Sequence, residues 1–204
     1  KFRLHALLNG NLSEKQTAKL LGLQKDINEI DSLIDEILTL QKAEHKQAYA
    51  KIPLNPLLKS LLELHGVQYA NIEYCLQCEP ECVIYGDPNL IKRALQNLIQ
   101  NAFKHAKKRV HVDVFEKGNN LKLEISDDGE GINANKKDQV FTPFIRLDSS
   151  RNKKTGGFGL GLAIVKRICD AHGIKVWIED SPLGGARFCL LIPLNPKMLE
   201  ELAI

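Results

Sequence analysis

Features of membrane-bound and nucleic-acid-binding proteins are missing from this chain of 204 residues. It contains no run of about 18 apolar residues, the length that a helix needs to cross a bilayer, and no signal-peptide pattern. Aromatic residues make up only 6%, and the net charge is only +3, from 28 Lys and Arg against 25 Asp and Glu. The basic cluster at 104–109 has no interleaved aromatic residues. We therefore expect no membrane segment in these residues and no nucleic-acid partner.

Cysteine is sparse and odd in number, at five residues. Cys75, Cys78 and Cys82 form a C-x₂-C-x₃-C pattern, which is typical of metal sites. A tetrahedral zinc site needs a fourth ligand, for which His65 is the nearest candidate in the sequence. Cys75 and Cys82 also fit the ends of two short strands, where free thiols are common. A metal or redox role and a purely structural role both stay open, and a reducing compartment suits all five thiols.

Four glycines fall within six positions of the segment Gly156-Gly157-Phe158-Gly159-Leu160-Gly161, directly before an apolar run suited to a helix. Glycines let a ligand approach the backbone, and a helix N-terminus attracts phosphate. A Walker loop is excluded because Leu162 stands where Lys is needed. A dinucleotide fingerprint is excluded because the preceding segment, 148–154, is polar and not a strand. The segment indicates either a different phosphate cradle or a simple helix-capping turn.

A helix is predicted over 88–105, with Asp87 as its cap and Pro at its first position. Asn97 and Asn101 are four residues apart and therefore share one face, and Lys104 and His105 follow one turn later. Asn is a poor residue for a helix interior, so this pair suggests a polar site. An amide oxygen suits Mg²⁺, and a Lys can neutralise phosphate. The alternative is a solvated helix face.

An acidic, glycine-containing turn follows the alternating strand predicted at 121–126. It contains Asp127, Gly129, Gly131 and Ile132. A carboxylate at this position can accept a hydrogen bond from a flat ligand such as adenine, which the glycines allow to lie against the backbone. An ordinary acidic turn is the alternative. An EF-hand loop is excluded because its twelfth position is Asp138 and not Glu.

Four segments of the chain, in this order, resemble the characteristic boxes of a known protein family. Residues 97–105, 127–132, 141–148 and 155–165 resemble, in sequence, the N, G1, F and G2 boxes of sensor histidine kinases of two-component systems. The resemblance covers about residues 1–194. It implies the Bergerat (GHKL) ATP-binding fold, shared with gyrase, a heat-shock chaperone and mismatch-repair ATPases, with ATP and Mg²⁺ as ligands.

The resemblance also implies roles for single residues. Asp127 would select adenine, Asn101 would hold Mg²⁺, and Asn97, Lys104 and Arg146 would serve catalysis. The full set of residues implied to bind the nucleotide is Asn97, Asn101, Lys104, His105, Asp127, Gly129, Gly131, Ile132, Phe144, Arg146, Lys153, Thr155, Gly157, Phe158, Gly159, Leu160 and Gly161.

Two positions depart from related patterns. Asn97 stands where the related ATPases carry a Glu that activates water, and Asn cannot accept a proton at neutral pH. This departure favours phosphoryl transfer over hydrolysis. His105 stands where the family often has Tyr, and either ring can stack on or hydrogen-bond to a nucleotide.

The N-terminal region lacks the phosphoacceptor that the resemblance leads one to seek. None of the histidines has the acidic residue and Leu-Arg-Thr-Pro of an H box after it, so we expect a fragment that binds ATP but cannot autophosphorylate alone, with its acceptor His upstream of Lys1.

An apolar stripe with helical spacing runs through 12–47 and predicts a helical rod of about 54 Å. We expect residues 1–50 to be the C-terminal part of a dimerisation hairpin that forms a homodimeric bundle, although packing on the chain's own domain is the alternative.

Residues 51–204 are expected to form the catalytic ATP-binding domain. The predicted strands are 72–76, 82–85, 109–115, 121–126, 174–180 and 186–192, with hairpin turns at 117–120 and 183–185. The predicted helices are 56–65, 88–105 and 160–172, on one face of the sheet, with Asn55-Pro56 opening the first and a short tail helix after Asn195. The fold class is α+β, a two-layer α/β sandwich preceded by a long helix.

These patterns and the resemblance favour an ATP-dependent protein-histidine kinase whose phosphoryl group passes to an Asp of a response-regulator receiver domain. Two alternatives remain: a nucleotide-gated dimerisation scaffold without transfer activity, and a Ser/Thr kinase of the same fold. The expected location is the cytoplasm, either free or as the cytoplasmic part of an inner-membrane sensor.

Overall fold

A computed structural model describes residues 49–145 and 158–194, together with single positions between 16 and 38. The chain divides into two units, Lys1–Thr39 and Leu40–Ile204. The described positions of the first unit are helical. Their large apolar side chains, Leu21, Leu23, Ile27, Ile30, Ile34, Ile37 and Leu38, are 36% to 55% exposed. The full length of the helix predicted at 12–47 and the tail helix after Asn195 lie outside the described residues, and the division at residue 50 stays a prediction.

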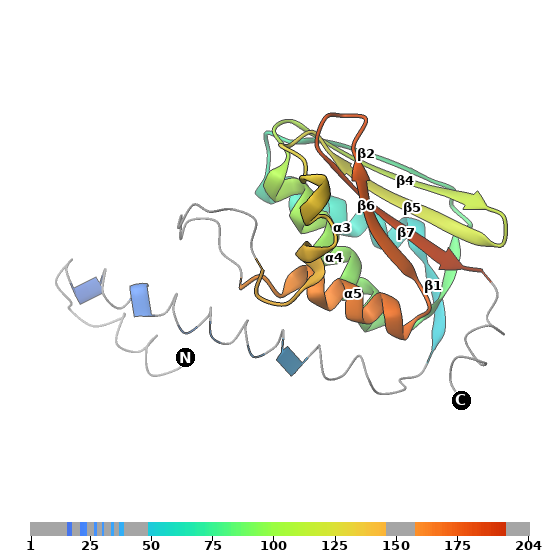
Figure 1. Cartoon of the computed structure of the whole chain (residues 1–204), viewed down its shortest axis with the longest axis horizontal. Helices are drawn as coiled ribbons and strands as arrows, with labels where there is room; N and C mark the ends of the chain where they lie inside the picture. The colour runs from blue at the N-terminus through green and yellow to red at the C-terminus, as the bar shows by residue number, and fades with distance from the viewer. Residues whose placement is uncertain are drawn as a thin grey trace. The chain divides into compact units, whose positions relative to one another are not determined.

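A five-stranded mixed sheet forms one layer of the second unit, in the order β2-β4-β5-β7-β6 (Figure 1). Its strands are β2 (Glu73–Cys78), β4 (Arg109–Lys117), β5 (Asn120–Asp127), β7 (Ala186–Pro193) and β6 (Lys175–Asp180). β2 and β4 are parallel, and every other neighbouring pair is antiparallel. The central position of β5 follows from its sequence, because its apolar residues alternate and pack against both neighbours.

Three helices cover one face of this sheet (Figure 1): α3 (Leu54–Gln68), α4 (Pro88–His105) and α5 (Gly161–Ala171). The apolar stripe of α4 is buried, and Leu98, Ile99 and Ala102 have no exposed surface. Leu123 and Ile125 of β5 are equally buried. Each such large side chain contributes about 1.5–3 kcal/mol of burial free energy. The predicted two-layer sandwich is confirmed, as are the predicted positions of its strands and helices to within a few residues.

A separate two-stranded ribbon corrects two local predictions. β1 (Ala50–Pro53), where no strand was predicted, pairs antiparallel with β3 (Val83–Gly86), which does not join the main sheet. The helix predicted to open at Asn55-Pro56 begins at Leu54, after Pro53. The Asn55 side chain is not its cap but donates from Nδ2 to the Cys78 carbonyl, 2.6 Å away. A tertiary contact has overridden the local capping preference here.

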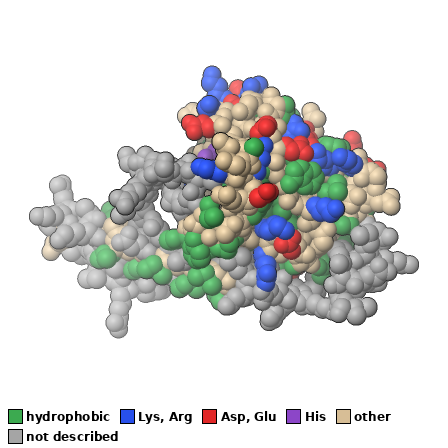
Figure 2. Space-filling view, in the orientation of Figure 1, with side chains coloured by type: hydrophobic (Ala, Val, Ile, Leu, Met, Phe, Trp, Pro, Cys, Tyr) green, Lys and Arg blue, Asp and Glu red, His purple; other side chains and the backbone are tan. Residues whose placement is uncertain are grey.

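The helix cap predicted at Asp87 and the hairpin turns predicted at 117–120 and 183–185 are confirmed. The Asp87 side chain accepts hydrogen bonds from the N–H groups of Asn89 and Leu90 at 2.8 and 3.0 Å. Gly118, with φ +60°, turns the chain between β4 and β5. On the face seen in Figure 2, acidic and basic side chains are mixed over the described part of the second unit.

Candidate functional site

The Asp127 carboxylate lies at the end of β5 and is only 2% exposed. Its Oδ1 accepts hydrogen bonds from the backbone N–H groups of Gly129 at 2.8 Å and Ala186 at 3.2 Å. The N–H of Gly185 donates to the Asp127 main-chain oxygen at 3.2 Å. Both bonds to the side chain go to Oδ1, so they fix the carboxylate in orientation without using Oδ2. We refer to these residues (Asp127, Gly129, Gly185 and Ala186) as the carboxylate clamp.

Opposing effects act on the ionisation of Asp127. Burial raises the pKa of its carboxyl above the usual 3.8, while the backbone donors and nearby His105 lower it. Burial is the largest of these influences, and the net direction of the pKa is upward. The proximity of His105 also shows that the end of α4 lies beside the clamp.

Gly129 makes the contact between the clamp and α4 close. A Cβ built on Gly129 would lie 2.4 Å from the main-chain oxygen of His105, which no side chain could tolerate. Glycine is required here because two backbones approach each other directly. The predicted G1 segment therefore packs on the last turn of the predicted N-box helix.

Asp128, for which no role was predicted, holds the chain in place after α4. Its Oδ1 accepts backbone hydrogen bonds from Lys107, Lys108 and Arg109 at 2.8, 3.0 and 3.1 Å. Although partial burial raises the pKa of Asp128, these three donors hold it below the usual value. The carboxylate thus organises the turn into β4.

Near the middle of α4, its polar face contacts the start of α5. The Asn97 Nδ2 donates to the Gly161 main-chain oxygen at 3.1 Å. Asn101 and Lys104 lie between this contact and His105 on the same helix face, and both are half-buried. The helix therefore links the clamp to the glycine-rich segment through side chains on one face.

A hydrogen bond between Phe144 and Gly159 connects the two described segments that flank residues 146–157. The Phe144 N–H donates to the Gly159 main-chain oxygen at 3.0 Å. Both residues have positive φ, 65° and 75° respectively, a strained conformation for Phe. The Phe144 side chain is 66% exposed. This pair is called the Phe144–Gly159 clip below.

The sequence-predicted residues divide into three groups. Asp127, Gly129 and His105 meet at the clamp, Asn97 meets Gly161, and Phe144 meets Gly159. The half-buried Ile132 and Phe158, the buried Leu160 and the exposed Gly131 lie in the same segments. The remaining predicted residues, Arg146, Lys153, Thr155 and Gly157, lie outside the described residues.

Gly185 and Ala186 were missed because the glycine pair at 184–185 was interpreted only as a hairpin turn. Gly184 does serve the turn, with φ +106°, whereas Gly185 has no positive φ. A Cβ on Gly185 would lie 2.1 Å from the Asp127 Oδ1, so this glycine provides space. The available signal was a second glycine in a turn that needs only one.

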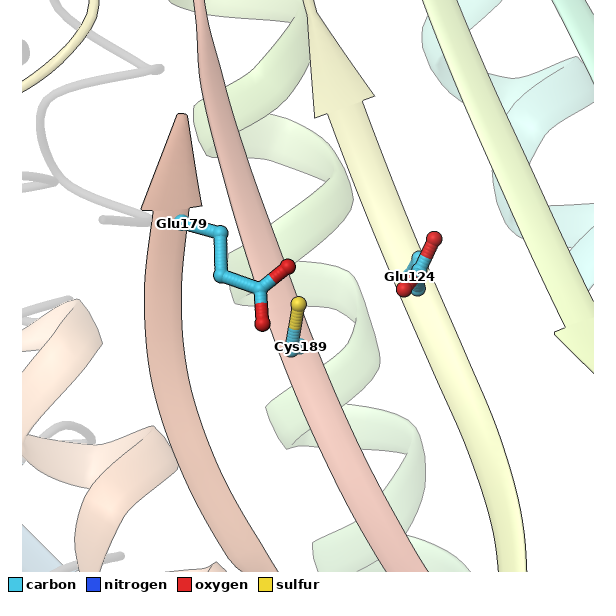
Figure 3. Close-up of side chains that lie close together, drawn as sticks. All are labelled: Glu124, Glu179 and Cys189. Atoms are coloured by element: carbon cyan, nitrogen blue, oxygen red, sulfur yellow. The ribbon is translucent and has the colours of Figure 1, made fainter. Parts of the chain in front are cut away.

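Metal ligands of the usual acidic and thiol types meet at one place among the described residues: Glu124, Glu179 and Cys189, whose ligand atoms lie within 4.8 Å of one another (Figure 3). Their chemistry does not fit a cation. Lys122 Nζ lies 2.5 Å from Glu124 Oε1, and Arg187 lies 3.3 Å from Glu124 Oε2. Burial also raises the pKa of Cys189 to about 12, so this thiol is protonated.

The zinc site considered for Cys75, Cys78 and Cys82 is not supported, since Cys75 and Cys78 lie on opposite faces of β2.

Comparison with known proteins identifies the family. The family described as "Histidine kinase-, DNA gyrase B-, and HSP90-like ATPase" matches residues 86–196, which is more than half of the chain. The chain therefore belongs to this family. It is 34% identical over 199 residues to the sensor protein RstB of Escherichia coli K12, covering 95% of this chain and 45% of RstB. It is 29% identical over 187 residues to the sensor histidine kinase CpxA of the same strain, covering 89% of this chain and 41% of CpxA.

A solved structure has a similar fold. The full-length ShkA structure, in complex with AMPPNP, matches with a TM-score of 0.81 at 23% identity, covering 94% of this chain and 41% of ShkA. The chain is homologous to catalytic domains of sensor histidine kinases, and it spans less than half the length of the curated relatives described. No helix among the described residues is long and apolar enough to span a membrane.

Proposed function

We propose that this chain is the ATP-dependent catalytic region of a protein-histidine kinase in a two-component sensor. The observation that carries the proposal is the carboxylate clamp. Two backbone donors occupy Asp127 Oδ1, so Oδ2 can accept a hydrogen bond from the adenine amino group. The homology with sensor histidine kinases and the AMPPNP bound by ShkA support the same ligand.

The polar face of α4 is suited to the phosphate side. The half-buried Asn101 offers an amide oxygen for Mg²⁺, and Lys104 supplies a positive charge on the same face. Magnesium, when bound, would neutralise charge on the transferring phosphoryl group. Asn97 orients the glycine segment through Gly161, and the glycines there leave the backbone open to phosphate. Arg146, Lys153, Thr155 and Gly157 are proposed to complete the phosphate contacts.

Transfer rather than hydrolysis is favoured by the chemistry of Asn97. Its amide cannot accept a proton at neutral pH, so an attacking water molecule lacks a general base. The nucleophile is then an imidazole nitrogen on the dimerisation helices of the sensor. The phosphoryl group passes on to an aspartate of a response-regulator receiver domain. The proposal includes a homodimer, formed through the exposed apolar stripe between Leu21 and Leu38. It also includes a location on the cytoplasmic side of the membrane, where ATP is available.

Calorimetric titration with ATP and Mg²⁺ tests the clamp. Asp127→Asn keeps the shape of the side chain but replaces an acceptor by a donor, and it should weaken ATP binding by about 30-fold or more. Asp138→Asn is the matched control, because Asp138 is exposed and its side chain caps no helix. Equal affinity of the two variants would refute the proposed role of Asp127.

Labelled ATP tests the type of transfer. The chain is mixed with a separate helical segment of a sensor that bears an H-box His, and the label is followed. Acid-labile, base-stable label on that helix is expected for a histidine kinase. ATP binding without transfer under any pairing would favour the scaffold, and acid-stable label would favour a Ser/Thr kinase.

A further inference from the structure

Two cysteines face each other across the turn between β2 and β3. Cys78 is the last residue of β2, and Cys82 directly precedes β3. The Cys78 Sγ donates to the Glu79 main-chain oxygen at 3.5 Å, and the Cys82 thiol is close enough to influence the ionisation of Cys78. The turn between them, Glu79-Pro80-Glu81, is closed by a hydrogen bond from the Cys82 N–H to the Glu79 carbonyl at 3.2 Å. Both residues are half-buried, so small oxidants can reach the sulfurs.

The backbones of both cysteines are held by the start of α3. The Asn55 Nδ2 donates to the Cys78 carbonyl at 2.6 Å, and the Leu54 N–H donates to the Cys82 carbonyl at 2.9 Å. A disulfide requires the two Cα atoms to lie within about 7 Å of each other. The closed turn and these two anchors on consecutive residues of α3 keep the backbones of the pair near each other before any bond forms.

No third metal-binding side chain completes this pair among the described residues. Cys75 lies on the opposite face of β2, because the face that carries Tyr74 and Cys78 packs toward the helices, as the contact of Tyr74 with Phe103 of α4 shows. Cys169 and Cys189 are buried in α5 and β7. The one described group of three potential metal ligands contains neither Cys78 nor Cys82. A dithiol without further ligands is suited to oxidation rather than to holding a metal ion.

We propose that Cys78 and Cys82 form a peroxide-oxidisable dithiol that closes to an intramolecular disulfide. The Cys82 thiolate attacks one oxygen of hydrogen peroxide, forming an S–O bond and breaking the O–O bond. The hydroxide released takes up the proton that Cys82 lost and becomes water. The Cys78 sulfur then attacks the Cys82 sulfenic acid, the S–S bond forms and the S–O bond breaks. The departing hydroxide takes the Cys78 proton, so two thiols lose two electrons and peroxide becomes two water molecules.

The protonation of Cys78 suits the second role. Burial and then the neighbouring Cys82 raise the pKa of the Cys78 thiol to about 12. The protonated Cys78 is a poor first nucleophile, so the second attack is assigned to it. The inference uses none of the residues assigned to ATP, so it stands independently of the proposed function.

Mass spectrometry of the intact chain tests the pair. The native protein is treated with hydrogen peroxide, unfolded, and alkylated at its remaining thiols. Two of the five cysteines are expected to escape alkylation, with a mass loss of about 2 Da that dithiothreitol reverses. Cleavage after Glu81 separates Cys78 from Cys82, so the oxidised protein should yield the two peptides joined. Alkylation of all five cysteines, or a cross-link to another cysteine, would overturn the proposal.

Matched variants and an unfolded control sharpen the test. Cys75→Ser should retain the joined peptides, whereas Cys78→Ser and Cys82→Ser should each lose them. Cys82→Ala serves as a second variant if a serine variant does not fold. In concentrated urea, where the anchors from α3 are absent, disulfide formation should be at least about 10-fold slower. Equal rates in native and unfolded protein would show that the fold does not create the pair.

Discussion

The two ends of the candidate nucleotide site are built differently. At the carboxylate clamp, one buried side chain is held by backbone N–H groups from two separate segments, and Asp128 next to it binds three more. At the glycine-rich end, the described contacts are one bond from Asn97 to Gly161 and one from Phe144 to Gly159. The end proposed to bind the base is thus held by several backbone donors, whereas the described residues of the end proposed to bind phosphate are held by these two bonds. A pre-formed recognition point loses little entropy on binding.

The largest effect is expected from Gly185→Ala, which should break the base-binding end. The added Cβ would lie 2.1 Å from the Asp127 Oδ1 and 2.4 Å from the Gly129 N. Calorimetry should show at least about a 100-fold loss of ATP affinity, since Asp127 must move. Gly184→Ala is the control, because its Cβ meets nothing within 4 Å and only its φ of +106° is strained. If both variants bind ATP equally, Gly185 does not position Asp127.

A smaller and more selective effect is expected from Gly159→Ala at the phosphate end. Its Cβ would lie 2.9 Å from the Ile145 carbonyl and disturb the Phe144–Gly159 clip. ATP affinity should fall by about 10-fold while adenosine affinity is kept, because the clamp is untouched. Gly118→Ala controls for backbone strain, since it has a similar φ of +60° and open space around it. Equal losses for adenosine and ATP would mean that the two ends are not independent.

The smallest effect concerns His65, which belongs to neither end. It is 4% exposed, stacks near Phe103, and neither ring nitrogen has a hydrogen-bond partner. Burial lowers the pKa of His65 below 6.5. Stability from the neutral ring is therefore present above pH 6.5 and is lost as the pH falls through the lowered folded-state pKa.

His65→Leu should raise the free energy of unfolding by about 1 kcal/mol and reduce its loss between pH 6.5 and 5. Urea unfolding at several pH values measures both changes, and ATP affinity at pH 7.5 should stay constant. An unchanged pH profile would assign the acid sensitivity to other groups, with His172, whose pKa burial also lowers, as the next candidate.

Much of this architecture could be predicted because the patterns are local. The cap and apolar stripe of α4, the alternation in β5 and the turn at Gly118 each follow from a few neighbouring residues. The failures involve partners that are distant in sequence. β1 forms by pairing with β3, and the Asn55 side chain donates to the Cys78 carbonyl instead of capping the helix.

The same distinction applies to the site. Asp127 was predicted as a site residue because an acidic residue and glycines follow a strand, and Asn97 and Asn101 were predicted because they repeat on one helix face. Gly185 and Ala186 were not predicted because they contact Asp127 from a distant hairpin, with Ala186 59 positions away in the sequence. The positive φ of Phe144 also had no sequence signal, and it accompanies a hydrogen bond to Gly159, which is distant in the sequence.

The parallel pairing of β2 with β4 has a consequence for assembly of the domain. β4 with β5 and β6 with β7 are hairpins, so each pair closes only a short loop. β2 can pair with β4 only after β3 and α4, which separate them, have been brought into a crossover. The chain entropy lost in closing so long a loop is offset by docking α4, so this edge strand depends on the helix layer for its place in the sheet.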